Sequence, residues 1–128
     1  MNKKIVITAA LLGALAVITG AFGAHGLKAK LEPQQLQVWG TAVQYHFYHV
    51  LALLFLATFG RVTTGLTYAS YWLFTLGILF FSGSLYLLSC SSILGWSWLR
   101  VLGPITPIGG LLFIGGWVTL ALAAWKQK

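Results

Sequence analysis

Hydrophobic residues in this chain gather into four long runs, separated by short polar stretches. A helix that crosses a bilayer needs about 20 apolar residues, with a range of about 17–25. The runs at 5–22, 41–59, 71–88 and 105–125 meet that length, and no Lys, Arg, Asp or Glu falls inside any of them. The pattern predicts an all-α fold, an integral membrane bundle of four transmembrane helices that forms a single domain over residues 1–128.

The second run is polar in its first half, "VQYHFYH", and apolar from Val50 onward. Pro33 can open a helix that continues directly into this run. With 3.6 residues per turn, such a helix has two polar faces. His46 and His49 share one face with Gln35, Ala42 and Leu53, and the opposite face holds Gln37, Thr41, Gln44 and Tyr48. Two polar faces cannot both meet lipid, so at least one is expected to face other helices or a watery pocket.

The stretch 23–40 is the longest connection, and Leu27, Leu31 and Leu36 interrupt its polar residues. We expect it to lie along the membrane interface as an interfacial segment between the first two helices. The first run, preceded by Lys3 and Lys4, also resembles a secretory signal. Because three further hydrophobic runs follow, we interpret it as a retained first helix.

Composition supports lipid as the solvent, since 59% of the 128 residues are hydrophobic and only 7% are charged. Ordinary soluble domains carry about 25% charged residues. The net charge of +7 comes from basic residues that stand singly or in pairs between the runs, which is typical of headgroup contacts rather than nucleic-acid binding. Five basic residues (Lys3, Lys4, Arg61, Lys126, Lys128) flank one side of the predicted bundle and three (Lys28, Lys30, Arg100) the other. The positive-inside rule therefore predicts that both termini are cytoplasmic.

Helices in lipid associate through close backbone approach and interhelical hydrogen bonds. Small residues at four-residue spacing permit such approach. The residues predicted to pack helices together are Gly13, Ala16, Gly20, Ala24, Gly83, Gly115 and Thr119.

Polar side chains from all four runs are expected to meet near the outer membrane border. The candidate polar cluster comprises His25, Gln44, Tyr45, His46, His49, Ser82, Ser84, Tyr86 and Thr106. Glu32 is the only acidic side chain, so we expect no metal site. His46 and His49 lie on one helix and therefore cannot both ligate the iron of one haem. The single Cys90 excludes an internal disulfide. We expect these groups to be interfacial anchors and interhelical hydrogen-bonding groups, with no catalytic residue and no cofactor.

Four blocks of the sequence resemble the domain of unknown function 423 family, which includes the eukaryotic transmembrane protein 256 group. They are "GAFGAHGL" at 20–27, "VQY" at 43–45 with His49, "FSGSLY" at 81–86 and "GPITPIGG" at 103–110. The resemblance covers nearly the whole chain and implies a small four-helix protein of the bacterial plasma membrane, without an established activity. His46 stands where the family usually has glutamine, which counts against any ligand site that needs both His46 and His49. His25 and His49 are therefore the pair to test first.

From these observations we expect a non-enzymatic scaffold or accessory subunit, within a larger membrane complex or a homo-oligomer. A conduit or binding pocket for a small polar solute or a proton is the alternative. A histidine-dependent haem, metal or redox enzyme of the membrane is the third possibility.

Overall fold

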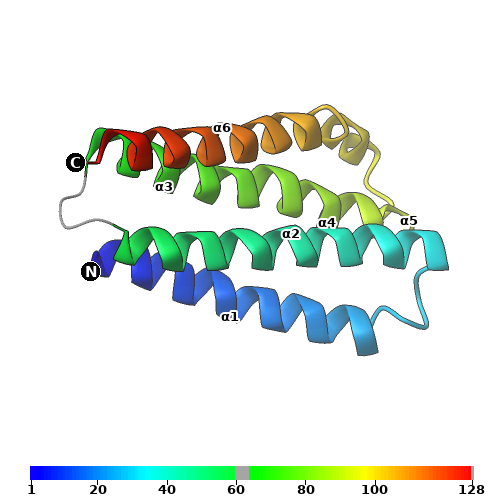
Figure 1. The fold of residues 1–128 in the computed structure, drawn as a ribbon. Coiled ribbons are helices and arrows are strands. Elements are labelled where there is room, and N and C mark those ends of the chain that lie inside the picture. Colours follow the sequence, from blue (N-terminus) through cyan, green and yellow to red (C-terminus); the bar gives the residue numbers. More distant parts are fainter. Residues whose placement is uncertain (60–63, 128) are drawn as a thin grey trace.

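Four long helices dominate the computed structural model, which describes residues 1–59 and 64–127 (Figure 1). They are α1 (Lys3–His25), α2 (Pro33–Thr58), the continuous helix formed by α3 (Gly65–Gly77), η1 (Ile78–Ser82) and α4 (Gly83–Ser89), and α6 (Ile105–Lys126). The π-helical turn η1 joins α3 to α4, and the short helices α5 (Ser91–Leu94) and η2 (Ser97–Leu102) connect α4 to α6. The predicted all-α, four-helix fold class is confirmed.

The helices cover the four hydrophobic runs and extend beyond most of them. The third begins at Gly65 rather than at residue 71, and α1 continues through His25. Within the described residues, three helical stretches are long and apolar enough to cross a membrane: Lys3–His25, Gly65–Ser89 and Ser97–Lys126. The remaining long helix, α2, is the one that carries the polar run.

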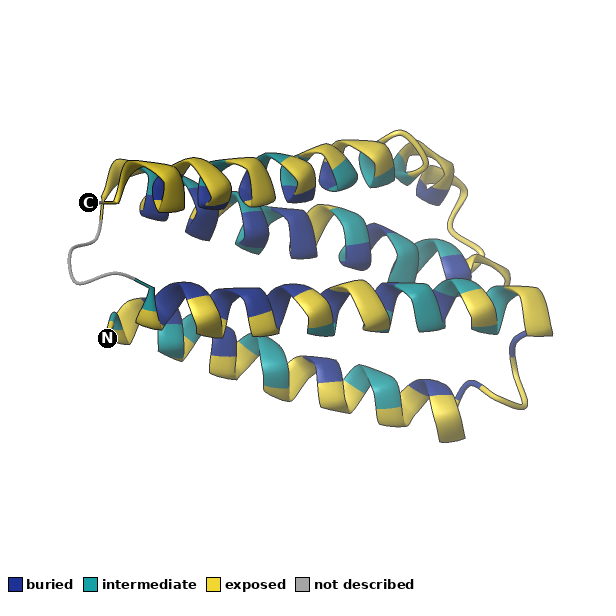
Figure 2. Ribbon diagram, in the orientation of Figure 1, coloured by how far each residue is buried: buried dark blue, intermediate teal, exposed yellow. Residues whose placement is uncertain are grey.

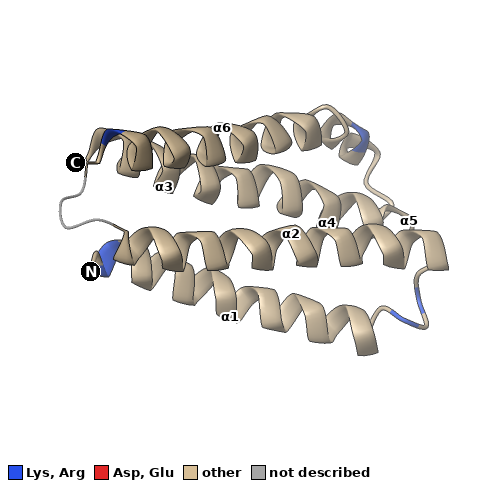
Figure 3. Cartoon of the chain, in the orientation of Figure 1, with Lys and Arg blue, Asp and Glu red and all other residues tan. Residues whose placement is uncertain are grey.

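The helices pack as two close pairs, α1 with α2 and α3 with α6, and α2 joins the pairs by packing along α3, η1 and α4. Both termini lie at one end of the bundle, and the α1–α2 and α4–α6 connections lie at the opposite end, called the far end below (Figure 1). The described Lys and Arg residues lie at the two ends of the bundle, and none lies in its middle (Figure 3). Arg61 and Lys128, which enter the charge count for orientation, lie outside the described residues.

Large hydrophobic side chains cover the outside of the bundle as well as its core. Phe74 and Leu53 are fully buried in the main cluster, whereas Leu11 and Leu111 are 68% and 67% exposed. The exposed residues form the outward faces of the long helices (Figure 2). This distribution is expected where lipid is the solvent, because an apolar side chain that faces lipid tails has no free-energy cost of exposure to water.

The connection between α1 and α2 is shorter than the predicted interfacial segment, because helix occupies both of its ends. Only residues 26–32 lie outside the two helices. Leu27 and Leu31 are buried against Trp39, so this connection folds back over the helix ends and closes a second, smaller core at the far end.

The closest helix contacts lie at glycines other than the predicted ones. A Cβ added at Gly109 of α6 would lie 2.7 Å from the Phe81 Cα in η1. A Cβ at Gly23 would lie 2.5 Å from the Trp39 ring, and one at Gly116 would lie 2.6 Å from the Phe74 ring. Among the predicted glycines, added Cβ atoms at Gly13, Gly20 and Gly115 would meet Val50, Val43 and Leu73 at 3.3, 3.5 and 3.4 Å.

The other predicted packing residues divide into buried and open positions. Ala16 is fully buried, and Thr119 bonds to Ser70 of α3 through their hydroxyls at 2.7 Å. Ala24 is exposed, and nothing lies within 4 Å of a Cβ at Gly83. Gly83 therefore does not have the packing role that the sequence predicted.

The contact at Gly109 yields a test with a control at the next residue. We expect Gly109→Ala to lower the free energy of unfolding in detergent by about 1–3 kcal/mol, because its methyl group collides with backbone that cannot rotate away. Gly110→Ala should be nearly neutral, since the nearest atom lies 3.9 Å from the added Cβ. Equal stability of the two variants would contradict this contact.

Candidate functional site

The structure does not gather the predicted polar cluster into one site. Gly13 lies beside Val50 and Gly20 beside Val43, so His49 is level with Ala14 of α1. His25 stands exposed eleven residues further along α1, a distance of about 16 Å at 1.5 Å per residue. His25 and His49 are thus separated, and His49 lies deep in the bundle rather than at its border.

Both ring nitrogens of His49 have hydrogen-bond partners. Nδ1 donates to the backbone carbonyl of Tyr45 at 2.7 Å, and Nε2 accepts the indole N–H of Trp117 in α6 at 3.1 Å. A carbonyl oxygen only accepts, which fixes the tautomer with its proton on Nδ1. The imidazole also stacks on Phe113, with ring centroids 3.6 Å apart and planes inclined by 5°. His49 therefore joins α2 to α6 and has no free lone pair for a metal or a proton.

An apolar hollow of about 580 Å³ lies beside His49, between α2, η1 and α6. The aromatic rings of Tyr45, Phe81, Phe113 and Trp117 line it together with His49. Tyr45 itself is 40% exposed, and its ring lies 4.8 Å from that of Phe81. This lining suits an apolar molecule better than a polar solute.

His46 faces different helices from His49, although only three residues separate them. Its Nδ1 bonds to the Tyr86 hydroxyl of α4 at 2.8 Å, and that hydroxyl also meets Thr19 Oγ1 of α1 at 3.0 Å. The other nitrogen, Nε2, is buried without a hydrogen-bond partner among the described residues, and the Leu12 backbone lies near the ring. Tyr86 thus ties α1, α2 and α4 together at one point.

The predicted serines act as links between helices. Ser82 Oγ donates to the Ala42 carbonyl at 2.8 Å, which joins η1 to α2. Ser84 Oγ lies 2.6 Å from Thr106 Oγ1 and joins α4 to α6. Gln44 is exposed and belongs to none of these links.

Sequence reasoning missed further links, including those nearer the terminal end of the bundle. Thr8 bonds to Tyr71 at 2.8 Å and Ser70 to Thr119 at 2.7 Å, while the Trp39 indole donates to the Thr19 carbonyl at 2.9 Å. A hydroxyl inside an apolar run was the only available signal. That signal is weak, because Ser and Thr often bond to their own helix, as Ser70 also does to Leu66.

Cys90, the single cysteine of the chain, packs against the small core formed by Leu27, Leu31 and Trp39. Burial raises the pKa of its thiol above the ordinary value. A thiol held protonated is a poor nucleophile and a poor metal ligand. Within the described residues, no group of three or more His, Cys, Asp or Glu side chains is placed to hold a metal ion.

The second polar face of α2 points away from the bundle. We call it the α2 outer face; its residues are Gln34, Gln37, Thr41, Gln44, Tyr48, Leu51, Phe55 and Thr58. All are exposed except Thr41, which is half-buried. Gln44 lies about 16 Å along the helix from Pro33, close to the middle of the 26-residue α2.

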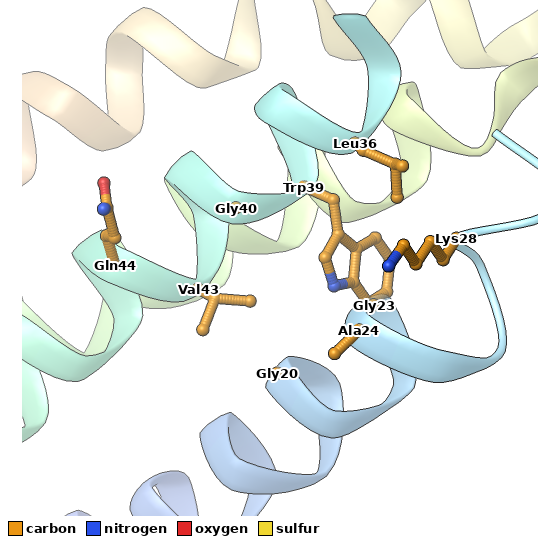
Figure 4. A pocket seen from close by; sticks show the side chains of 9 residues that line it. All are labelled: Gly20, Gly23, Ala24, Lys28, Leu36, Trp39, Gly40, Val43 and Gln44. Atoms are coloured by element: carbon orange, nitrogen blue, oxygen red, sulfur yellow. The ribbon is translucent and has the colours of Figure 1, made fainter. Parts of the chain in front are cut away.

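A hollow of about 520 Å³ borders this face at the far end, between α1 and α2. Its floor is made of small residues, including Gly20, Gly23 and Gly40, with the Trp39 ring beside them. Lys28 and Gln44 lie toward opposite ends of the hollow (Figure 4). The α2 outer face therefore continues into a concave surface.

Comparison with known proteins finds similarity over the full length of the chain. Residues 19–110 match the family described as "Protein of unknown function (DUF423)". UPF0382 membrane proteins of Staphylococcus haemolyticus and Staphylococcus aureus are 45% and 47% identical to it, with 97% of each chain covered. The UPF0382 membrane protein YwdK of Bacillus subtilis is 44% identical over 97% of this chain and 98% of its own. No solved structure matches the chain.

The His49–Trp117 bond can be measured with a double-mutant cycle. His49→Phe keeps a ring against Phe113 but removes the bond, as does Trp117→Phe from the other side. We expect a coupling free energy of about 0.6–1.7 kcal/mol, the range of hydrogen bonds between membrane helices. Pairing His49→Phe with Trp125→Phe is the control, because Trp125 is 86% exposed, and its coupling should be near zero. Indistinguishable couplings would show that the bond contributes nothing.

Proposed function

The chain belongs to the DUF423 family of multi-pass bacterial membrane proteins, and from this premise we propose that it is a non-enzymatic scaffold or accessory subunit. It acts through lateral contact with another membrane protein, which packs on the α2 outer face. The family is one of unknown function, so the proposal rests on the geometry of this chain.

One observation carries the proposal: α2 presents carboxamides to the surroundings at membrane depth. Gln44 and, nearer the start of the helix, Gln37 are exposed, and neither side chain has a hydrogen-bond partner inside the bundle among the described residues. A polar group left unpaired in hydrocarbon costs several kcal/mol. A protein neighbour that supplies hydrogen bonds removes this cost, whereas lipid tails cannot.

The interior of the bundle supports a structural role for the buried polar groups. His49 has both nitrogens engaged, and Ser82, Ser84 and Tyr86 hold pairs of helices together. General acid–base or ligand chemistry needs a group with a lone pair or proton to offer. A haem, metal or redox enzyme that depends on His49 is accordingly poorly supported.

The alternative is a binding pocket or conduit, and the hollow beside His49 is the feature that favours it. Its lining is mostly aromatic and aliphatic, so an apolar molecule fits it better than the small polar solute suggested by sequence. The polar links along the bundle join separate groups of two or three helices, which is unlike the connected chain of groups that carries protons or solutes.

We place the protein in the plasma membrane with both termini in the cytoplasm. The support is the excess of basic residues on the side of the termini, five against three. Trp96, just before η2, and Trp98, within η2, have ring centroids 5.6 Å apart and suit the headgroup layer on the other side.

Purification in a mild detergent, followed by mass spectrometry, tests the function. We expect the tagged protein to recover a membrane protein in fixed ratio, and expect Gln44→Leu to lose it, because leucine cannot replace the amide contact. His49→Phe is the matched control and should retain the partner, since this ring is buried. A wild-type protein that always purifies as a lone monomer would overturn the proposal, as would a haem spectrum or bound metal that disappears in His49→Phe.

A further inference from the structure

We propose that the hollow between α1 and α2 at the far end binds one anionic phospholipid, with the phosphate at Lys28 and an acyl chain against Gly40. The site is separate from the contact proposed above, because neither Lys28 nor Gly40 belongs to the α2 outer face. Three features support it: a cation without a partner, a recess with open space, and the order of the two along the membrane normal.

Lys28 lies at the depth of lipid headgroups, three residues after the apolar stretch Lys3–His25 that is long enough to cross a membrane. Its side chain lines the hollow, and it has no ion pair or hydrogen bond among the described residues. Glu32, the only acidic side chain, lines a different hollow, between α2 and α4. The ammonium group is therefore available to an anion, and phosphate is the anion that the headgroup layer supplies.

The recess beside Lys28 has room for part of a hydrocarbon chain. The hollow has a volume of about 520 Å³, within the range of about 300–1,000 Å³ that small-molecule sites occupy. Nothing lies within 4 Å of a Cβ placed at Gly40, and one placed at Gly20 meets a single side chain, at 3.5 Å. The Trp39 ring lies beside them, and its indole N–H is already bound to a backbone carbonyl of α1. The ring therefore offers the hollow an apolar surface.

The order of these groups along the membrane is that of a phospholipid. Lys28 and Gln44 lie toward opposite ends of the hollow (Figure 4). Gly20 lies five residues inward from the end of α1 at His25, about 8 Å at 1.5 Å per residue. A phosphate at Lys28 thus directs its acyl chains along the recess toward the interior of the membrane.

The charge at the outer end of the hollow favours a lipid over a protein as the occupant. Every phospholipid has a phosphate at this depth, whereas a partner helix meets Lys28 only if it carries an acidic residue at the same level. A headgroup with net negative charge is favoured further, because a choline headgroup already neutralises its own phosphate.

Lipid titration of the full-length protein in detergent, read by native mass spectrometry, tests the site. We expect phosphatidylglycerol to bind more tightly than phosphatidylcholine, and Lys28→Gln to weaken its binding about fivefold, the contribution of one basic residue near headgroups. Lys30→Gln is the matched control. It makes the same change of charge in the same connection, but Lys30 does not line the hollow, so the affinity should stay nearly unchanged.

A second pair of variants fills the recess without changing the charge. Gly40→Leu places a side chain in open space, so phosphatidylglycerol binding should fall to the level of phosphatidylcholine. The thermal stability of the bundle should hold or rise, because leucine favours a helix more than glycine does. Gly83→Leu is the control, since a Cβ there also has nothing within 4 Å but lines a different hollow. It should leave the binding of phosphatidylglycerol unchanged.

Three results would overturn the site. Equal affinities of the wild type for the two lipids, or equal effects of Lys28→Gln and Lys30→Gln, would leave only diffuse attraction of lipid to a basic surface. Tight binding that survives Gly40→Leu would place the lipid elsewhere. If Lys28→Gln and Gly40→Leu lose a co-purifying protein and no lipid, the hollow belongs to that protein, and the proposed accessory role survives without the lipid site.

Discussion

Lipid hydrocarbon offers no hydrogen bonds, and this single constraint explains the placement of nearly every polar side chain in the bundle. A buried hydroxyl or imidazole away from the interface is stabilised by a partner on another helix or on its own backbone. Tyr86 does so with His46 and Thr19, Ser84 with Thr106, and His49 with Trp117. Because the hydrophobic effect does not drive helices together in lipid, these hydrogen bonds and the close packing at glycines such as Gly109 hold the helices against each other.

The same constraint makes α2 the central helix of the fold. It contacts α1 on one side and the α3–η1–α4 helix on the other, and it bonds to α6 through His49. Its inward polar groups serve these contacts. Close packing between α6 and η1 follows from Gly109, whose missing side chain leaves room for the Phe81 backbone at the π-helical turn.

One polar face of α2 is buried in the bundle and the other is exposed, and this difference underlies the proposed function. The side chains of His46 and His49 form hydrogen bonds inside the bundle, so few of their polar atoms remain free for catalysis or ligand binding. The face with Gln37, Gln44 and Tyr48 stays exposed, and an exposed carboxamide that meets lipid tails finds no hydrogen-bond partner there. Inside the described part of the bundle, His46 Nε2 and Thr75 Oγ1 are the buried side-chain atoms without a partner, whereas the α2 outer face keeps its carboxamides available for the contact proposed above.

The sequence by itself determined the membrane class, the four long helices and the existence of two polar faces on α2, because length, hydropathy and helical period are local properties. It also identified Ser82, Ser84 and Tyr86 as polar groups in apolar runs. Only the tertiary structure decided that His25 and His49 lie far apart, that His46 and His49 contact different helices, that Gly109 rather than Gly83 allows close packing, and that Thr8, Thr19 and Trp117 are partners. These outcomes depend on how far helices shift and rotate against each other, and a spacing of residues along one chain contains no measure of either.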